Sequence, residues 1–540
     1  MLPALIPDPS ELEPELGAAT DPGVPASPSE PSKVTRDLVS GTSGLGLGVM
    51  IERGSGFAAN ILAARLGGAA TFGAYSLALS TANNIATYAG AGIGSTAARF
   101  SGKYQYGSAG YGMLVRVLML VSLVSAAAAS AGLWFAAGPL ARLMGEGRLI
   151  HLLHWAALSA GGMILLECAR GFFVGQRRLA ALVLMSLIVG VGLLALLPVA
   201  AWKHNPIRMI TSQGCITIGA VVICLLLGRQ FHLLSPPTEV EHRGLGGMLK
   251  EVWGFGFVQL AGLVGTNLAG WWLITLLARA DTSLVQMGFF SIASQLRNIV
   301  GLAPSLLTEG SYAVMADPEG EVLRTPQNVL GWITFASVMV TFLLAALGIM
   351  VIPWLLRILY SSTYSHAAVA ASYGLALAAM HTANGPASAR LSILSIKTTG
   401  VINAGWAAVV ALSGSIVMVH GADAATVMMI YLGGHTLTSI SVLTALHRRN
   451  SLPRGMVGVF TLATGSTIAL ALLSTSRAAH PDLTVPLTAT MILLFAGTLA
   501  ALIRMGRRYG WIPTRAAVSQ LAGYVKRSTY RVVRRQSHAV

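Results

Sequence analysis

Fourteen separate stretches of about twenty mostly apolar residues constrain the fold of this chain more than any other feature of its sequence. A helix needs roughly twenty apolar residues to cross about 30 Å of hydrocarbon, so each stretch is long enough to span a membrane. The predicted spans cover residues 45–65, 73–97, 111–136, 150–172, 180–201, 209–228, 254–278, 286–308, 329–352, 366–388, 396–418, 425–446, 456–475 and 485–504. The sequence therefore predicts an all-α polytopic membrane protein with about 14 transmembrane helices.

Lysine and arginine are distributed unevenly between the two sides of these spans. With the N-terminus in the cytoplasm, 25 of the 36 basic residues fall on the cytoplasmic side, eight fall on the other side, and Arg53, Arg116 and Arg297 lie within spans. Cytoplasmic loops carry an excess of Lys and Arg, and one missed helix would reverse the side of every later loop. The asymmetry supports fourteen spans with both termini in the cytoplasm.

The composition agrees with a membrane protein and excludes several other classes. Only 10% of the residues are charged and 54% are apolar, whereas about a quarter of a soluble domain is charged. The net charge of +16 follows from the loops and does not indicate a nucleic-acid partner. Cys168, Cys215 and Cys224 all lie in apolar spans, without a disulfide framework or metal-ligand spacing. The sequence predicts no metal site and no cofactor.

An internal repeat divides the spans. The segment FGAYSLALSTANN (72–84) follows the first span, and MGFFSIASQLRN (287–298) follows the seventh. Alignment without gaps pairs Gly73 with Gly288, Tyr75 with Phe290, Ser76 with Ser291, Leu77 with Ile292, Ala78 with Ala293, and Asn83 with Asn298. Both copies begin a second helix after a short outer turn, with the same polarity. This predicts two six-helix halves related by an axis along the membrane normal, and two further helices.

Four segments carry a resemblance to a known family: RLGGAATFGAYSLALS at 65–80, GIGSTAARF at 92–100, MGFFSIASQLRNIVGLAPSLL at 287–307 and ILYSSTYSHAAVAAS at 358–372. They resemble the Wzx-type polysaccharide and O-antigen flippases, the polysaccharide transporter branch of the multidrug/oligosaccharidyl-lipid/polysaccharide exporter superfamily. The similarity covers nearly all of residues 40–505 and rests on glycine and aromatic patterns. It implies two six-helix lobes around a central cavity, plus two C-terminal helices, in the bacterial inner membrane.

The resemblance also implies a function. Such a protein flips an undecaprenyl-pyrophosphate-linked oligosaccharide from the cytoplasmic to the periplasmic leaflet by alternating access, in exopolysaccharide or O-antigen (lipopolysaccharide) biosynthesis. Its expected partners are the lipid-linked oligosaccharide, a polysaccharide polymerase and the export machinery. The alternatives are a multidrug or cation exporter of the same superfamily, and a membrane-embedded polysaccharide polymerase or ligase. The chain contains no D-x-D and no G-x-x-x-x-G-K-[ST] motif, so we expect that it is not an enzyme.

The spans and the resemblance together predict the domain organisation. The expected parts are a disordered cytoplasmic tail at 1–40, an N-terminal lobe at 41–230 with helices 1–6, a cytoplasmic linker at 231–250, a C-terminal lobe at 251–447 with helices 7–12, helices 13–14 at 448–505, and a basic cytoplasmic tail at 506–540. The basic tail is either an interfacial amphipathic helix bound to anionic membrane lipids or an ordinary disordered segment.

Two arginines within the spans are the main candidates for substrate binding. Arg297 lies near the middle of the eighth span, where a charge costs about 2.5–3.5 kcal/mol on an insertion scale. A guanidinium group matches phosphate in a bidentate geometry, so we expect Arg297 to hold the pyrophosphate in the cavity. Arg53 lies about 12 Å into the first span and is expected to meet the same group from the cytoplasmic side. For Arg297, the alternative is a structural arginine paired with a carbonyl or an acid.

Other polar residues in the spans extend this hypothesis. Five amide side chains are candidates for hydrogen bonds to the glycan, or alternatively for contacts between helices: Asn60, Asn83, Asn84, Gln295 and Asn298. Glu52 and Glu167 are candidates for ion coupling. The alternative for Glu52 is a counter-charge for another helix, and for Glu167 an ion pair with Arg170 three residues later.

Clusters of helix-breaking residues predict where the helices bend. The runs GLGLG at 44–48 and GAGIG at 90–94 are expected hinges, and Pro304 is the corresponding breaker in the second copy of the repeat.

Overall fold

The computed structural model describes residues 33–90, 92–104, 108–176, 178–230, 245–316, 326–421 and 423–512. Residues 1–40 and residues 41–540 form two compact units, and the fold below is that of the second. Within the described ranges the chain is helical and contains no β-strand.

The helices reproduce the predicted spans. They are α1 (Lys33–Gly90), α2 (Ile93–Lys103), α3 (Ala109–Leu143), α4 (Leu149–Gly175), α5 (Leu179–Trp202), α6 (Pro206–Gln230), α7 (Leu245–Ala280), α8 (Val285–Ala316), α9 (Pro326–Leu359), α10 (Ala368–Leu394), α11 (Ile396–Val417), α12 (Ala424–Arg448), α13 (Met456–Ala479) and α14 (Thr484–Arg508). Helix α1 holds the first two predicted spans, α2 continues the second, and each helix from α3 to α14 holds one. The prediction of an all-α polytopic protein is confirmed.

Nine helices in the described part of the chain are long and apolar enough to cross a membrane, namely α3 to α6, α9 and α11 to α14. The same measure does not select α1, α7, α8 or α10. These four helices carry most of the polar residues of the cavity described below. Polar side chains in a membrane helix normally face the bundle interior or a water-filled cavity. The less apolar helices are therefore the ones that line the cavity.

Helix α1 is two helices joined at a kink. Gly68 has φ 76° and ψ 167°, a conformation that only glycine adopts readily. The kink lies in the short outer turn that the sequence predicts between the first two spans. The glycines of the predicted hinge at 44–48 lie inside the helix of α1 without a break, so hinging there stays a prediction. The hinge predicted at 90–94 does interrupt the helix, since α1 ends at Gly90 and the left-handed Gly92 precedes α2.

The second copy of the repeat shows no such break. Pro304, predicted as its breaker, lies inside the continuous helix α8, so α8 does not end there. A proline within a helix removes one backbone hydrogen bond, but neighbouring helices in a membrane bundle can offset this loss.

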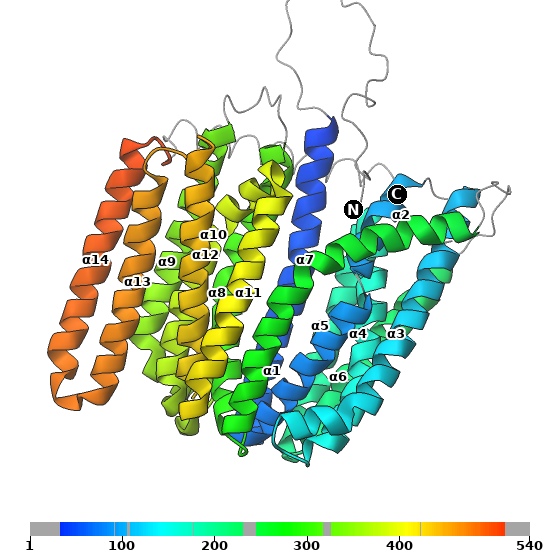
Figure 1. Cartoon of the computed structure of the whole chain (residues 1–540), viewed down its shortest axis with the longest axis horizontal. Coiled ribbons are helices and arrows are strands. Elements are labelled where there is room, and N and C mark those ends of the chain that lie inside the picture. Colours follow the sequence, from blue (N-terminus) through cyan, green and yellow to red (C-terminus); the bar gives the residue numbers. More distant parts are fainter. Residues whose placement is uncertain are drawn as a thin grey trace, which may run out of the picture. The chain divides into compact units, whose positions relative to one another are not determined.

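The helices pack in two groups, as the duplicated sequence predicts. Helices α2 to α6 contact one another, and α7 to α12 contact one another. Contacts of α7 with α2 and α3 join the groups. Helices α13 and α14 pack side by side against α9, and α13 also contacts α10 (Figure 1). The architecture is two six-helix lobes with two additional helices beside the second lobe.

The two copies of the repeat meet at a close crossing of α1 and α8. A Cβ added to Gly73 would lie 2.7 Å from the Gly288 nitrogen and still closer to the Leu284 carbonyl oxygen, and a Cβ on Gly288 would overlap the Ala69 carbonyl. Two backbones can approach this closely only where both helices carry glycine. We call this contact of Ala69 and Gly73 with Leu284 and Gly288 the glycine crossing.

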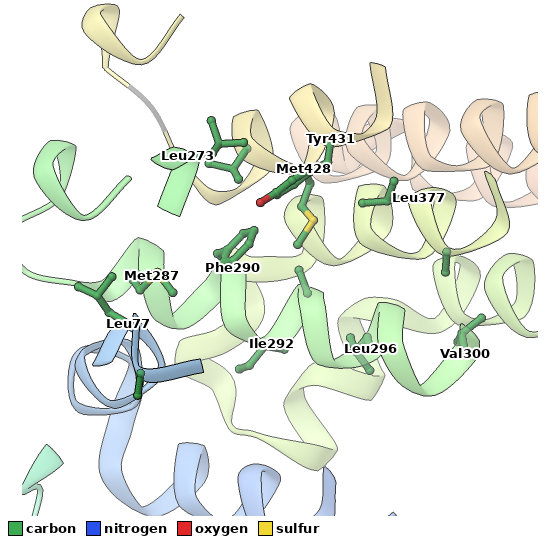
Figure 2. Packing of buried hydrophobic residues seen from close by; sticks show 14 of the residues in the cluster. Leu77, Leu273, Met287, Phe290, Ile292, Leu296, Val300, Leu377, Met428 and Tyr431 are labelled. Atoms are coloured by element: carbon green, nitrogen blue, oxygen red, sulfur yellow. The ribbon is translucent and has the colours of Figure 1, made fainter. Parts of the chain in front are cut away.

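Apolar and polar contacts support the glycine crossing. Figure 2 shows Leu77 of α1 beside Met287 of α8, and both are buried. Nearby, the Tyr364 hydroxyl in the turn η2 (Ser362–Ala367) donates to the Ala64 carbonyl at 3.0 Å. Burial raises the pKa of Tyr364, so its hydroxyl keeps the proton that it donates. The Arg65 Nη1 donates to the Ile358 carbonyl at 2.9 Å.

Parts of three predicted segments lie outside the described residues. Helix α1 already begins at Lys33, within the segment predicted as a tail, and the rest of that tail at 1–32 is not described. Of the predicted linker, residues 245–250 belong to α7. The predicted basic tail is described only as far as residue 512. The proposed domain boundaries and the cytoplasmic position of the termini therefore stay predictions.

Candidate substrate cavity

A cavity of about 760 Å³ lies among α1, α7, α8, α10, α11 and α12. Its polar and aromatic lining consists of Arg53, Asn60, Asn83 and Asn84 of α1, Thr266, Asn267 and Trp271 of α7, Gln295, Arg297, Asn298 and Ser305 of α8, His381 and Thr382 of α10, Trp406 of α11, and Tyr431 and His435 of α12. Along α8 these residues begin beyond Gly288. At 1.5 Å per residue, Arg297 lies about 14 Å along the helix from the glycine crossing.

The structure brings together all seven residues predicted to bind the pyrophosphate or the glycan. Arg53 and Arg297 line the same cavity, one from each half of the repeat. The five predicted amide side chains line it with them: Asn60, Asn83, Asn84, Gln295 and Asn298. Asn83 and Asn298 are equivalent positions of the internal repeat, so the duplicated sequence supplies one amide from each lobe. Their roles in binding stay predictions.

Arg297 is held by its neighbour on the same helix. Its Nε and Nη2 donate to the Asn298 Oδ1 at 3.3 and 3.2 Å. It makes no ion pair within the described part of the chain, so the alternative of a structural arginine paired with an acid has no support there. A guanidinium has five donors, and this single acceptor leaves most of them available to a ligand.

Arg53 is exposed, and it makes no hydrogen bond or ion pair with any described residue. It lies where the main cavity meets a second pocket of about 290 Å³. A cation at this junction can contact an anion in either space.

The two predicted coupling acids lie in the second pocket and not in the main cavity. Arg170 of α4 forms an ion pair with Glu52 of α1, and its Nη1 lies 2.6 Å from Glu167 Oε1. Ser186 of α5 also donates to Glu52, at 3.3 Å. Arg170 thus provides both the counter-charge considered for Glu52 and the local ion pair considered for Glu167. Ion coupling by these acids stays a prediction.

Several amide and indole groups of the main cavity have unused hydrogen-bonding capacity. Asn60 Oδ1, Gln295 Oε1 and the Trp406 Nε1 are buried and have no hydrogen-bond partner. Buried polar atoms are almost always paired, so these three orphaned groups are consistent with a ligand that carries hydroxyl or amide groups. Asn84 differs, since it donates to the Ser80 carbonyl at 2.9 Å and accepts from the Tyr88 hydroxyl at 3.3 Å.

The comparison with family models decides the family. Residues 38–308, half of the chain, match the model described as "Polysaccharide biosynthesis protein". The chain belongs to this family. No curated protein matches the chain by sequence.

Several solved structures share the fold of this chain. "Lipid II flippase MurJ, inward closed conformation" matches with a TM-score of 0.61 and 12% identity, over 86% of this chain and 98% of that chain. An inward-facing multidrug resistance MATE family transporter of the MOP superfamily matches with a TM-score of 0.60 and 14% identity, over 78% and 98%. An outward-facing transporter of the same family matches with a TM-score of 0.54 and 14% identity, over 80% of this chain and 99% of that chain. At these identities the likeness shows the fold, which is the fold expected from the sequence.

The structure adds lining residues that the sequence alone did not single out. Trp406 stacks on Tyr431 at 6.0 Å between ring centroids, and Tyr431 stacks on Phe290 at 6.3 Å. Figure 2 shows the Phe290 side chain pointing toward Met428 and Tyr431. We call Phe290, Tyr431 and Trp406 the aromatic row. His435 packs against Trp406 at the end of this row, with 5.3 Å between the ring centroids.

A signal for some of these residues was present in the sequence. His381 and His435 are the imidazoles near the middle of the tenth and twelfth spans, where a titratable side chain is as unusual as an arginine. Trp406 and Tyr431 carry no such signal, because aromatic residues are common on lipid-facing surfaces of membrane helices. The described residues hold no group of three or more His, Cys, Asp or Glu side chains that fits a metal ion.

Proposed function

We propose that this protein flips a lipid-linked oligosaccharide, carried on undecaprenyl pyrophosphate, from the cytoplasmic to the periplasmic leaflet of the bacterial inner membrane. The observation that carries the proposal is the charge of the main cavity. Its described lining contains two arginines, one from each lobe, and neither aspartate nor glutamate. Two arginines can neutralise about two negative charges, which is the charge of a pyrophosphate diester.

The rest of the lining supports a saccharide attached to that anion. Amide side chains on both lobes offer donors and acceptors for hydroxyl groups, and three buried groups of the lining have no partner. Two members of the aromatic row, Trp406 and Tyr431, line the cavity and offer a flat apolar surface of the kind on which a sugar ring packs. In this proposal the arginines hold the pyrophosphate, the amides contact the glycan, and the lipid chain stays in the bilayer. The family description and the MurJ-like fold agree with such a substrate.

Alternating access follows from the duplicated architecture. The glycine crossing closes the two lobes against each other at one end, and the cavity lies beyond it. Rocking of the lobes about the cavity would open the crossing and expose the arginines on the other side, as proposed for transporters built from repeats. Export of two negative charges from a negative cytoplasm is favoured by about 4.6 kcal/mol per 100 mV, so the membrane potential alone can supply a driving force.

The second candidate is a multidrug or cation exporter. The fold is equally similar to MATE transporters, with a TM-score of 0.60 against 0.61 for MurJ. However, an organic cation would meet two arginines in the main cavity without an acidic side chain from its described lining. Electrostatic repulsion makes this candidate the weaker of the two. Family and fold also favour a transporter over a polymerase or ligase.

The decisive experiment removes the charge of Arg297. Purified protein is reconstituted in liposomes with a labelled undecaprenyl-pyrophosphate-linked oligosaccharide, and its arrival in the opposite leaflet is measured with a membrane-impermeant lectin or glycosidase. We expect Arg297→Ala to reduce flipping at least tenfold and Arg297→Lys to retain part of it, because lysine keeps the charge without the bidentate geometry.

The matched control is Arg116→Ala. Arg116 is an exposed arginine of α3 that does not line the cavity. Flipping by the Arg297→Ala protein at the rate of the Arg116→Ala protein would refute the role of Arg297. In cells the same variants are compared by surface polysaccharide, and co-purification of a polymerase or export component would identify the proposed partners.

A further inference from the structure

Two histidines in the main cavity form a pair. His381 of α10 and His435 of α12 face each other with 3.5 Å between their Nδ1 atoms and 4.8 Å between ring centroids. Both side chains line the cavity that contains Arg297. His435 is additionally oriented by the Trp406 ring, at 5.3 Å. We refer to these two residues as the histidine pair.

The contact between the two Nδ1 atoms restricts the protonation of the pair. Each imidazole has two ring nitrogens, and a hydrogen bond between two Nδ1 atoms requires one to carry a hydrogen and the other to lack it. The accepting ring must then carry its hydrogen on Nε2, while the donating ring has a bare Nε2. The neutral pair therefore has one free nitrogen. A single added proton fits there, whereas a second would place two Nδ1 hydrogens against each other.

The charges around the histidine pair determine when that proton is favourable. The other charged or titratable groups that line the cavity are Arg297 of α8, Tyr431 of α12 and Arg53 of α1. Helices α7 and α11 contribute only uncharged residues to the described lining, and α9 and α13, which also pack on α10, contribute none. Without an anion, a proton on the pair would add a third positive charge to a cavity that already contains two arginines. A bound anion adds negative charge next to the pair and so favours its protonated form.

We propose that the histidine pair is an anion subsite that takes up one proton from water when the cavity binds a pyrophosphate headgroup. The proton adds to the free Nε2 of the pair, and no other bond forms or breaks. The resulting imidazolium donates a charge-assisted hydrogen bond to an oxygen of the ligand. This inference rests on the proposed function and adds to it a linkage between substrate binding and pH, located in the C-terminal lobe.

The sign of the linkage follows from proton uptake. Because the complex binds one more proton than the separate components, affinity for the anion rises as pH falls. A single linked proton changes the dissociation constant by at most about tenfold per pH unit. The change should begin as the pH falls from about 8 through the range in which imidazoles titrate.

The test measures proton uptake directly. The probe is undecaprenyl-pyrophosphoryl-N-acetylglucosamine, whose pyrophosphate diester stays fully ionised in this range. Binding to the full-length protein in detergent is followed by calorimetry at one pH in two buffers with different heats of ionisation, which gives the number of protons absorbed. We expect uptake approaching one proton for the wild type, and none for the double variant His381→Gln with His435→Gln.

A matched control uses another pair of histidines. His151 and His154 lie one turn apart on α4, with ring centroids 6.2 Å apart, and neither lines the cavity. Their double glutamine variant should retain the proton uptake of the wild type. Thermal unfolding verifies that each variant is folded, and the single variants His381→Gln and His435→Gln replace the double variant if it is not.

The outcomes separate this inference from the proposed function. Binding of the probe without proton uptake, or with uptake that persists in the variants of the histidine pair, overturns the inference and leaves the flippase proposal intact. Failure of the wild type to bind the probe at any pH overturns the proposed function and the inference with it. Uptake that disappears only in the variants of the histidine pair supports both.

Discussion

Substitution of Gly73 by alanine at the glycine crossing is the sharpest test of how the two lobes meet. The new Cβ would lie 2.7 Å from the Gly288 nitrogen, against 3.4–4 Å for an ordinary contact. The helices would therefore have to separate by about 0.7 Å or more, and the atoms in the way are backbone atoms that cannot rotate aside. Overpacking of this kind costs about 1–3 kcal/mol. Alanine is the better helix former by at most about 1 kcal/mol.

The cost falls only on the conformation in which the crossing is closed. Helix propensity is the same in the open and closed forms, so an overpacking cost of about 1–2 kcal/mol lowers the population of the closed form relative to the open form by about 5- to 30-fold. Spin labels at the exposed positions Ala70 and Thr282, on either side of the crossing, report this by pulsed electron paramagnetic resonance. We expect Gly73→Ala to populate longer label distances than the wild type.

The control for this experiment is Gly219→Ala. Gly219 of α6 has open space where its Cβ would lie, so the substitution should leave the label distances unchanged. Equal distance distributions for the Gly73→Ala protein and the control would refute the argument that backbone contact at these glycines closes the lobes.

Two further predictions concern stability. Gly68→Ala should lower the free energy of unfolding by about 1–3 kcal/mol, because φ 76° with ψ 167° strains any residue that has a side chain. The measurement is thermal or denaturant unfolding in detergent. Gly132 also has open space where a Cβ would lie, so Gly132→Ala should not lower this free energy, and equal losses in the two variants would contradict the prediction. Arg170→Ala leaves Glu52 and Glu167 without their cation and should cost about 1 kcal/mol, since these groups are partly exposed. Neutralising Glu52 by Gln in the same protein should recover part of that loss, and no recovery would show that the ion pair is not its cause.

The symmetry of the repeat accounts for much of the site. Gly73 and Gly288 touch, and Asn83 and Asn298 both line the cavity. Each copy also packs onto the sixth helix of its own lobe: the Tyr75 hydroxyl donates to Gln213 of α6 at 3.3 Å, and Phe290 stacks on Tyr431 of α12. The arginines break this symmetry, because Arg53 and Arg297 occupy unrelated positions of the two halves. The two copies therefore share these packing positions, and the lobes differ in how they can hold a ligand.

The amino-acid sequence by itself determined the helices, the duplication and the residues worth testing. Hydropathy is a local property, since about twenty apolar residues suffice to predict a span whatever lies beside it. The cost of a charge in the bilayer is local as well, which is why Arg53, Arg297 and the amide side chains were identifiable without a structure. A short turn between the first two spans was also predictable, and the kink at Gly68 lies within it.

Only the tertiary structure decided which of these residues meet. Arg53 and Arg297 share a cavity although 243 residues separate them, and Glu52 pairs with Arg170 rather than with the arginine next to it. His381 and His435 form a pair because α10 packs on α12. The physical reason is that in lipid the apolar surface of a helix fits lipid as well as another helix. Packing partners are therefore chosen by small residues and a few polar contacts, which only the assembled bundle reveals.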